Sequence, residues 1–145
     1  MHKKTYASGF LFHTETAQIL LQQKNSSDAN TTWSLLGESV KSTESPEVAF
    51  KRIVSEHLKL TLPLKTVHKV YDYTDDASGE ERHICYAEIK STKKFSDFNG
   101  TVFEWFTLKE ISKLKISSQA KQDIIVGQRV IDSTSRRNSG EQTIG

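Results

Sequence analysis

Two short apolar-rich runs open the chain. Residues 5–13 and 17–23 are rich in β-forming residues and are separated by a polar segment, residues 14–16. This pattern predicts a β-hairpin with one face buried. The following residues, 24–32 (KNSSDANTT), are all polar apart from one alanine and have no periodicity. They predict an exposed loop.

A helix is predicted from about Pro46 to Lys59. Ser45 suits the N-cap position, and Pro46 suits the first helical position because its missing N–H would have no partner there. Arg52 and Glu56 form an i, i+4 pair on a face that adjoins an apolar arc. The arc consists of Phe50, Ile53, Val54 and Leu58.

The second half of the chain alternates in the same way. Residues 66–74, 82–89 and 101–108 predict three further strands. Residues 109–115 predict a short helix, and residues 117–131 place apolar side chains at helical spacing. We therefore expect the chain to end its ordered part on a helix.

The order of these elements predicts the fold class. Strands, one helix, three more strands and a final helix favour an α+β fold, an α/β/α sandwich whose mixed sheet carries helices on both faces. A chain of 145 residues with 35% hydrophobic residues fits one domain. We assign this domain to residues 1–131 and expect a disordered polar tail over residues 132–145.

Composition narrows the function classes only slightly. A net charge of +2 is too small to indicate nucleic-acid binding. The single cysteine, Cys85, excludes an intramolecular disulfide and a zinc site built on several thiolates, and its strand-like context favours a buried thiol over a nucleophile. No apolar run is long enough for a signal peptide or a membrane span, so we expect a soluble, cytoplasmic protein.

Polar residues around the first helix point to phosphate chemistry. Glu56 and Arg52 on the helix, with Gly37, Glu38 and Glu44 before it, could hold a hard divalent cation, since Mg²⁺ prefers oxygen ligands and accepts substrate phosphates as further ligands. Arg52 could orient a carboxylate through a bidentate pair. The alternative is an ordinary surface pair between Arg52 and Glu56.

Residues 38–60 resemble the Nudix box, the signature of the Nudix hydrolases, G-x5-E-x7-R-E-U-x-E-E-x-G-U with U an apolar residue. The match holds at Glu44, Arg52, Val54, Glu56 and Leu60. Outside the box, the opening hairpin, the segment WSLLG and the segment FEWFTLKEISKL are also similar to the family, and the resemblance spans residues 4 to about 131. It implies the sandwich fold and a hydrolase that cleaves a pyrophosphate bond in a nucleoside diphosphate derivative by divalent-metal-assisted attack of water.

The box is degenerate at the positions that matter for metal binding. The three metal-binding glutamates of the family correspond here to Ile53, Glu56 and His57, and the first glycine of the box is Glu38. The resemblance implies Glu56 as the main ligand for Mg²⁺ or Mn²⁺, with the backbone carbonyl of Gly37 as another. His57 either supplies a nitrogen ligand that favours Mn²⁺ or joins Ile53 in the apolar arc, and Glu38 is a candidate replacement carboxylate.

Further site candidates carry two alternatives each. Glu44 either braces the loop and Arg52 or takes part in catalysis. Trp33 either stacks on a nucleobase or packs in the core, and Glu104 lies where family members often place an additional ligand or base. Glu38, Trp33 and Glu104 are thus the candidates for contact with substrate.

Two hypotheses of different classes follow. The first is a Nudix pyrophosphohydrolase with Glu56, Arg52 and Glu44 as its catalytic residues. The second is a catalytically impaired Nudix domain that binds a nucleotide or serves as an interaction module, and it is motivated by Ile53 and His57. In both, the expected partner is a nucleotide-type small molecule, and the sequence does not identify the base or the oligomeric state.

Overall fold

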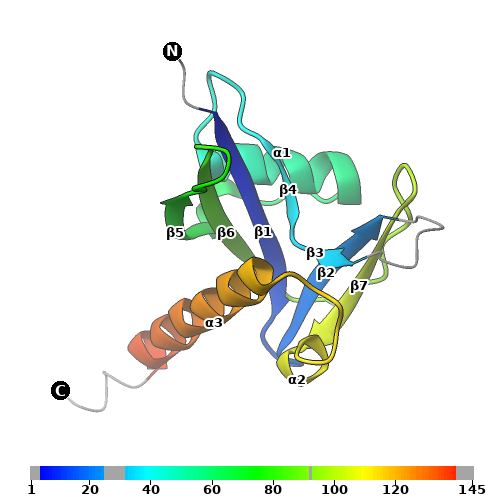
Figure 1. Ribbon diagram of the computed structural model, residues 1–145. Helices are drawn as coiled ribbons and strands as arrows, with labels where there is room; N and C mark the ends of the chain where they lie inside the picture. The colour runs from blue at the N-terminus through cyan, green and yellow to red at the C-terminus, as the bar shows by residue number, and fades with distance from the viewer. Residues whose placement is uncertain (1–3, 25–31, 92, 140–145) are drawn as a thin grey trace.

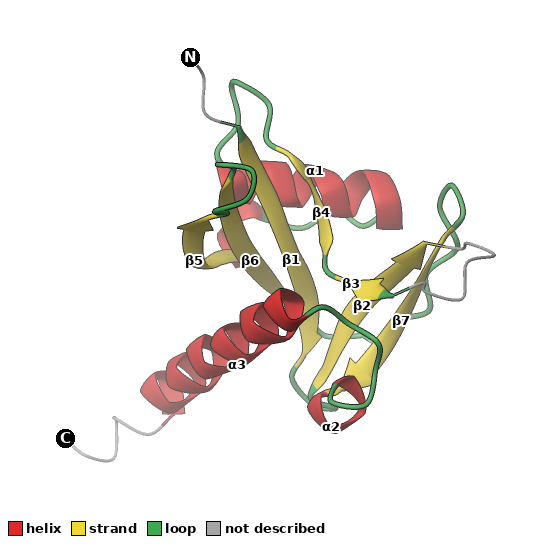
Figure 2. Ribbon diagram, in the orientation of Figure 1, coloured by secondary structure: helices red, strands yellow, loops and turns green. Residues whose placement is uncertain are grey.

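The computed structural model describes residues 4–24, 32–91 and 93–139. In these residues seven strands form one mixed sheet, and helices cover both of its faces (Figures 1 and 2). The strands are β1 (Thr5–His13), β2 (Gln18–Lys24), β3 (Trp33–Ser34), β4 (Leu36–Ser39), β5 (Val67–Thr74), β6 (Glu81–Ile89) and β7 (Thr101–Thr107). The helices are α1 (Pro46–Leu58), α2 (Leu108–Ile111) and α3 (Ser118–Ser139), with a 3-10 turn η1 (Leu64–Thr66).

The central strand β1 makes the sheet fork. Along one edge it pairs in parallel with β6 over its whole length. Along the other edge its first half pairs with β4, from Tyr6 to Gly9, whereas its last two residues pair with β2. β4 and the β2–β7 pair therefore diverge from the same edge of β1 (Figure 1).

Two apolar layers hold the helices to the sheet. Alternate residues of β1 point to opposite faces, so Leu11 packs with α1 and Phe10 and Phe12 pack with α2 and α3. The layer under α1 contains Leu11, Leu20, Leu36, Phe50, Ile53, Val54 and Cys85, and the layer under α3 contains Phe10, Phe12, Ile19, Leu21, Ile84, Phe106 and Ile124. The predicted α/β/α sandwich is confirmed, but β1 is buried on both faces, so the prediction of one buried face was wrong.

Local sequence signals define α1 well. The Ser45 hydroxyl accepts a hydrogen bond from the backbone N–H of Val48 at 3.2 Å, and Pro46 is the first helical residue, as predicted. The helix ends at Lys59, which adopts the left-handed conformation with φ of 57°. The family box has glycine at this position, and a lysine there accepts a strain of about 1 kcal/mol.

The thiol of Cys85 is buried. Its relative exposure is 0%, and burial raises its pKa to about 12. The thiolate is therefore not formed near neutral pH, as expected for a core cysteine.

Several boundaries differ from the sequence-based prediction. Residues 33–34 and 36–39 form the short strands β3 and β4, which were not predicted from the sequence. Helix α2 ends at Ile111, and α3 continues past residue 131 to Ser139, into the segment predicted to be disordered. The residues after 131 include no proline, and the first glycine is at position 140, so nothing in them stops a helix. The rest of that tail and most of the predicted loop, residues 25–31, lie outside the described residues.

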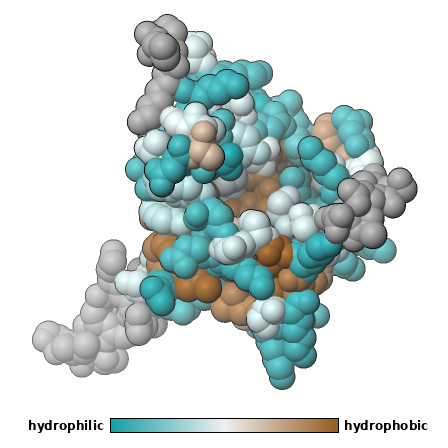
Figure 3. Space-filling model, viewed as in Figure 1, coloured by the Kyte–Doolittle hydropathy of each residue, from teal (hydrophilic) through white to brown (hydrophobic). Residues whose placement is uncertain are grey.

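Hydrophobic residues gather in the lower half of the space-filling view, around α3 and α2 (Figure 3). The upper half of that view, which includes the start of β1, is mostly hydrophilic (Figure 3). No helix in the described part of the chain is long and apolar enough to cross a membrane. The polar end of the sheet is therefore the part of the molecule where a site for a polar ligand is expected.

Candidate functional site

Arg52 joins three parts of the chain. Its Nε and Nη2 donate to the two carboxylate oxygens of Glu44 at 2.8 and 3.1 Å, and its Nη1 donates to Oε1 of Glu56 at 3.0 Å. Nη2 also donates to the backbone carbonyl of Ser39 at 3.1 Å. One guanidinium thus ties α1 to β4 and to the loop between them, and the predicted contacts of Arg52 with Glu44 and Glu56 are both present.

Glu44 is fully engaged by this arrangement. The hydrogen bonds from Arg52 hold the pKa of Glu44 below its usual value, and the backbone N–H of Lys41 adds a further hydrogen bond at 3.0 Å. The same pair raises the pKa of Arg52, mainly through Glu44. The Glu44 side chain is only 12% exposed, and its two-oxygen pairing with Arg52 favours the bracing alternative.

Glu38 and His57 form a second pair. Glu38 lies on β4 and its Oε2 is 2.5 Å from Nε2 of His57, while its Oε1 is 3.5 Å from Nη1 of Arg52. A carboxylate accepts hydrogen bonds, so His57 carries its hydrogen on Nε2. The His57 ring stacks on Phe98 with 4.7 Å between ring centroids. We call Glu38, Glu44, Arg52, Glu56 and His57 the box network.

Two residues that the sequence left open have defined surroundings. Ile53 has a relative exposure of 0% and lies in the apolar layer under α1, so it belongs to the core. Gly37 lies in β4 rather than in a loop, and a Cβ atom there would lie 2.7 Å from the Ser8 Cβ and 2.7 Å from the Tyr6 ring. A side chain at position 37 would therefore collide with β1, the strand with which β4 pairs.

The box network does not fit a divalent cation in this arrangement. Mg²⁺ and Mn²⁺ need several converging oxygen or nitrogen ligands. Among the described residues, no group of three or more His, Cys, Asp or Glu side chains is placed to hold a metal. Glu44 gives both oxygens to Arg52, Glu38 and Glu56 each give one, and Nε2 of His57 carries the hydrogen that Glu38 accepts. Among the described residues the predicted ligands Glu56, Gly37 and His57 are therefore not assembled as a metal site, and their role stays a prediction.

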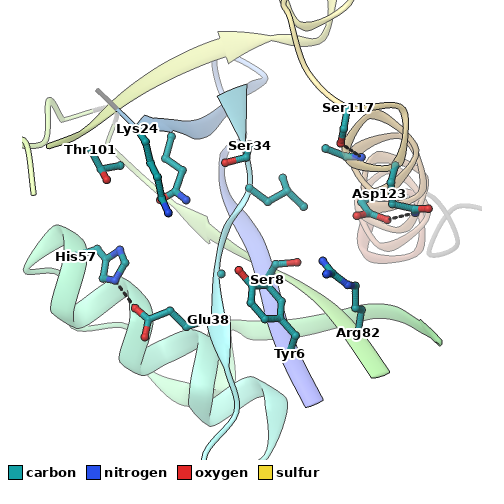
Figure 4. A pocket seen from close by; sticks show the side chains of 15 residues that line it. Tyr6, Ser8, Lys24, Ser34, Glu38, His57, Arg82, Thr101, Ser117 and Asp123 are labelled. Atoms are coloured by element: carbon teal, nitrogen blue, oxygen red, sulfur yellow. Dashed lines mark hydrogen bonds and ion pairs between the residues drawn. The ribbon is translucent and has the colours of Figure 1, made fainter. Parts of the chain in front are cut away.

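A pocket of about 450 Å³ opens beside the box network (Figure 4). β4 runs through it: Glu38 and His57 lie on one side of this strand, and Tyr6, Arg82 and Asp123 lie on the other (Figure 4). The strand residues alternate accordingly, since Tyr6 and Ser8 share a face of β1 with Phe10, which packs toward α3. We call Tyr6, Ser8, Arg82, Gln119 and Asp123 the α3-side wall.

Asp123 is a buried carboxylate in the α3-side wall. It is 4% exposed, and its Oδ1 accepts hydrogen bonds from the Tyr71 hydroxyl at 2.5 Å and from the Gln119 amide at 2.9 Å. Burial raises the pKa of Asp123, and burial together with Asp123 also raises the pKa of Tyr71. Both of these hydrogen bonds go to Oδ1, and Asp123 lines the pocket.

Arg82 brings a cation to the same wall. Its guanidinium lies 5.0 Å from the centre of the Tyr6 ring, and its Nη2 pairs with Glu80 at 2.9 Å. Its Nε is buried and has no hydrogen-bond partner in the described structure. Lys24, at the end of β2, lines the pocket from the opposite side of β4 (Figure 4). The pocket thus offers cationic donors as well as the Asp123 acceptor.

Two predicted substrate contacts lie elsewhere. Trp33 packs edge-on against Phe106, with 4.8 Å between ring centroids, in the layer under α3. Glu104 is exposed on β7, paired with Leu21. Neither is among the described side chains that line the pocket, so the alternative of core packing holds for Trp33.

The sequence carries a signal for the residues that were missed. On the face toward α3, apolar residues run along β1 and β6 and then change to polar residues at the same end of the sheet. On β1, Tyr6 and Ser8 come before Phe10 on the same face of the strand. On β6, Arg82 comes before Ile84 in the same way. A polar end on neighbouring strands marks a place where the covering helix leaves the sheet open.

Comparison with known proteins agrees with this architecture. The family model of the NUDIX domain matches residues 3–125. No protein with curated annotation is significantly similar to the chain in sequence.

Solved structures share the fold at low sequence identity. The NUDIX domain of Shewanella oneidensis NrtR, solved with ADP ribose, is 14% identical with a TM-score of 0.72, covering 90% of each chain. A mutT/nudix family protein from Listeria innocua is 17% identical with a TM-score of 0.72, covering 92% of this chain and 97% of its own. A C. elegans Ap4A hydrolase is 12% identical with a TM-score of 0.68, covering 88% and 98%. With the family model matched over most of its length, the chain belongs to the NUDIX domain family.

Proposed function

We propose that this chain binds a nucleoside diphosphate derivative in the pocket beside β4, as a Nudix domain that recognises its ligand without efficient divalent-metal hydrolysis. The observation that carries the proposal is the contrast within the pocket. The carboxylates of the box network pair with Arg52 and His57, whereas in the α3-side wall the Arg82 Nε is buried without a hydrogen-bond partner among the described residues. Buried polar atoms without partners mark a place where a ligand supplies the missing hydrogen bonds.

The charges support an ordered binding mode. Phosphate oxygens are expected near Arg82 and Lys24, because a guanidinium and an ammonium both bind phosphate well. N–H or O–H groups of the base or the ribose are expected at the Asp123 Oδ2, because a carboxylate accepts hydrogen bonds only. Glu38 adds a negative charge to the pocket wall and opposes a phosphate placed directly beside it.

Hydrolysis is the second candidate function. Glu56 keeps its place in the family pattern, its side chain is 50% exposed, and its hydrogen bond with Arg52 is present. A carboxylate this exposed could take part in metal binding after rearrangement of the box network. The family typically uses divalent metals, so this candidate predicts release of a nucleoside monophosphate that depends on Mg²⁺ or Mn²⁺.

A ligand panel tests the proposal. Thermal-shift and calorimetric titrations should include nucleoside diphosphates and triphosphates, dinucleoside polyphosphates and ADP-ribose, the last because a structural relative was solved with it. We expect at least one ligand to bind in the presence of EDTA. Arg82→Gln should weaken that ligand about 10-fold, the value of one lost charged hydrogen bond.

Arg129→Gln is the matched control, because Arg129 is exposed on α3 and does not line the pocket. It should leave the affinity unchanged. Chromatography of the same mixtures with Mn²⁺ separates the two candidates: bound ligand that stays intact supports the binding function, and metal-dependent turnover favours the hydrolase. If no member of the panel binds, the proposed ligand class is wrong.

A further inference from the structure

We propose that the pair formed by Glu38 and His57 has taken over the structural part of a divalent cation in this box, so that the β4–α1 junction keeps its shape without metal. The inference concerns the same site as the proposed function and rests on it only for the identity of the neighbouring ligand. It starts from the disagreement between the family pattern and this chain, where a glycine and a glutamate of the box are replaced by Glu38 and His57.

The pair of Glu38 and His57 connects β4 to α1. Glu38 comes from the strand and His57 from the last turn of the helix, so their contact at 2.5 Å joins β4, which carries Gly37, to α1, which carries Glu56. Glu38 also approaches Arg52 with its other oxygen, at 3.5 Å. A single carboxylate thus joins β4 to two successive turns of α1.

Both ring nitrogens of His57 are enclosed by the protein. Its Nε2 donates to Glu38, and its Nδ1 is buried with no hydrogen-bond partner in the described residues. Neither nitrogen is therefore available to a cation in the pocket: the first carries hydrogen, and the second is not accessible. The stacking of the ring on Phe98 at 4.7 Å fixes this orientation from the other side.

The carboxylates of the box network share one cation. The three carboxylates around the site, Glu38, Glu44 and Glu56, all contact the single guanidinium of Arg52. Lys59 adds a second cation, with its Nζ hydrogen-bonded to the carbonyl of Glu56 at 3.0 Å. These cations offset only part of the negative charge, but a divalent ion would have to compete with Arg52 for every one of the three carboxylates.

The two substitutions are expected to depend on each other. With glycine at position 38, the Nε2 hydrogen of His57 would lose its acceptor. With glutamate at position 57, two carboxylates would face each other at the distance of the present hydrogen bond, and each would disfavour the charged form of the other unless a cation entered between them. A carboxylate pair of that kind, next to Glu56, is the donor set that divalent cations prefer.

The test compares the wild-type chain, His57→Glu and the double variant Glu38→Gly/His57→Glu. The melting temperature is measured in EDTA and in millimolar Mn²⁺, and free Mn²⁺ is followed by electron paramagnetic resonance. We expect no Mn²⁺-dependent shift for the wild type. His57→Glu should melt lower in EDTA and recover with Mn²⁺, with an Mn²⁺ affinity at least about 10-fold above that of the wild type. Ser55→Glu, which adds a carboxylate on the exposed face of the same helix, should gain nothing.

Glu38→Gln and His57→Gln are variants that are expected to stay folded, because each retains a side chain that can hydrogen-bond to its partner. The proposal is overturned if wild-type protein binds Mn²⁺ and Glu38→Gln abolishes that binding, since Glu38 would then be a ligand. It is equally overturned if His57→Glu shows no gain of Mn²⁺. Nucleotide binding is titrated separately in EDTA on the wild type. A failure of the proposed function would appear in that titration, whereas a failure of the present proposal would appear in the Mn²⁺ measurements.

Discussion

The two sides of β4 both carry charged side chains, but these side chains are paired differently. On the box side, the three carboxylates contact Arg52, and one of them, Glu38, also contacts His57. On the α3 side, Arg82 and Asp123 are held in place by Glu80, Tyr71 and Gln119, yet the buried Arg82 Nε has no hydrogen-bond partner among the described residues. Satisfied polar atoms contribute to structure, and held but unsatisfied ones are available to a ligand.

The largest effect is expected for Ile53→Glu, which restores a family carboxylate on the box side. Ile53 is completely buried in the apolar layer under α1, so a charge at this position has no solvent and no partner. The free energy of unfolding should fall by at least about 3 kcal/mol in chemical denaturation. Ile125→Glu, at a site that is 45% exposed on α3, should change it by less than about 0.5 kcal/mol. A stable, metal-binding Ile53→Glu protein would contradict the core role.

Arg52→Ala should have the next largest effect. It removes four hydrogen bonds to Glu44, Glu56 and the Ser39 carbonyl and leaves Glu44, only 12% exposed, without its cation. We expect a loss of about 2–3 kcal/mol in the free energy of unfolding. Lys51→Ala, at the preceding position of the same helix, should be close to neutral. Equal effects of the two variants would show that the box network does not brace the fold.

The pH dependence of stability should report on Glu44. Its pKa is lowered in the folded protein by Arg52, so it stabilises the fold above its usual value of 4.5, and this contribution is lost as the pH falls through the lower folded value. Urea denaturation as a function of pH should show a steeper acid decline for the wild type than for Glu44→Gln. Parallel curves for the two proteins would mean that Glu44 gains nothing from its pairing.

Glu38→Gln should have a small effect of the opposite sign on ligand binding. It removes a negative charge from the pocket wall and keeps an amide that can accept from His57. We expect the affinity for a phosphate-bearing ligand in EDTA to rise by a few fold, as one screened repulsion across the pocket is relieved. Calorimetry measures this directly, and an affinity that falls would indicate that Glu38 contacts the ligand as an acceptor.

The sequence predicts the features that depend on neighbours along the chain. The start of α1 at Pro46, its apolar face and the spacing of Glu44, Arg52 and Glu56 follow from local rules, and each is present in the structure. The family resemblance adds the sandwich fold.

The sequence does not predict the features that depend on strand register. Gly37 and Glu38 form a strand only because they pair with Ser8 and Ala7, nearly thirty residues earlier in the chain. Asp123 reaches the pocket because α3 packs over the sheet. Glu38 and His57 look like two unrelated departures from the box, and only the fold shows that they meet. The sequence offered two roles for His57, a metal ligand or a member of the apolar arc. In the structure it is hydrogen-bonded to Glu38 and stacked on Phe98.

The central claim is that this Nudix domain binds its ligand through the α3-side wall without a divalent cation. A calorimetric titration of the best ligand of the panel, in EDTA and again in Mn²⁺, tests it most directly. The account predicts dissociation constants that agree within about two-fold and a ligand that is recovered intact. Binding or cleavage that appears only with Mn²⁺ would contradict it.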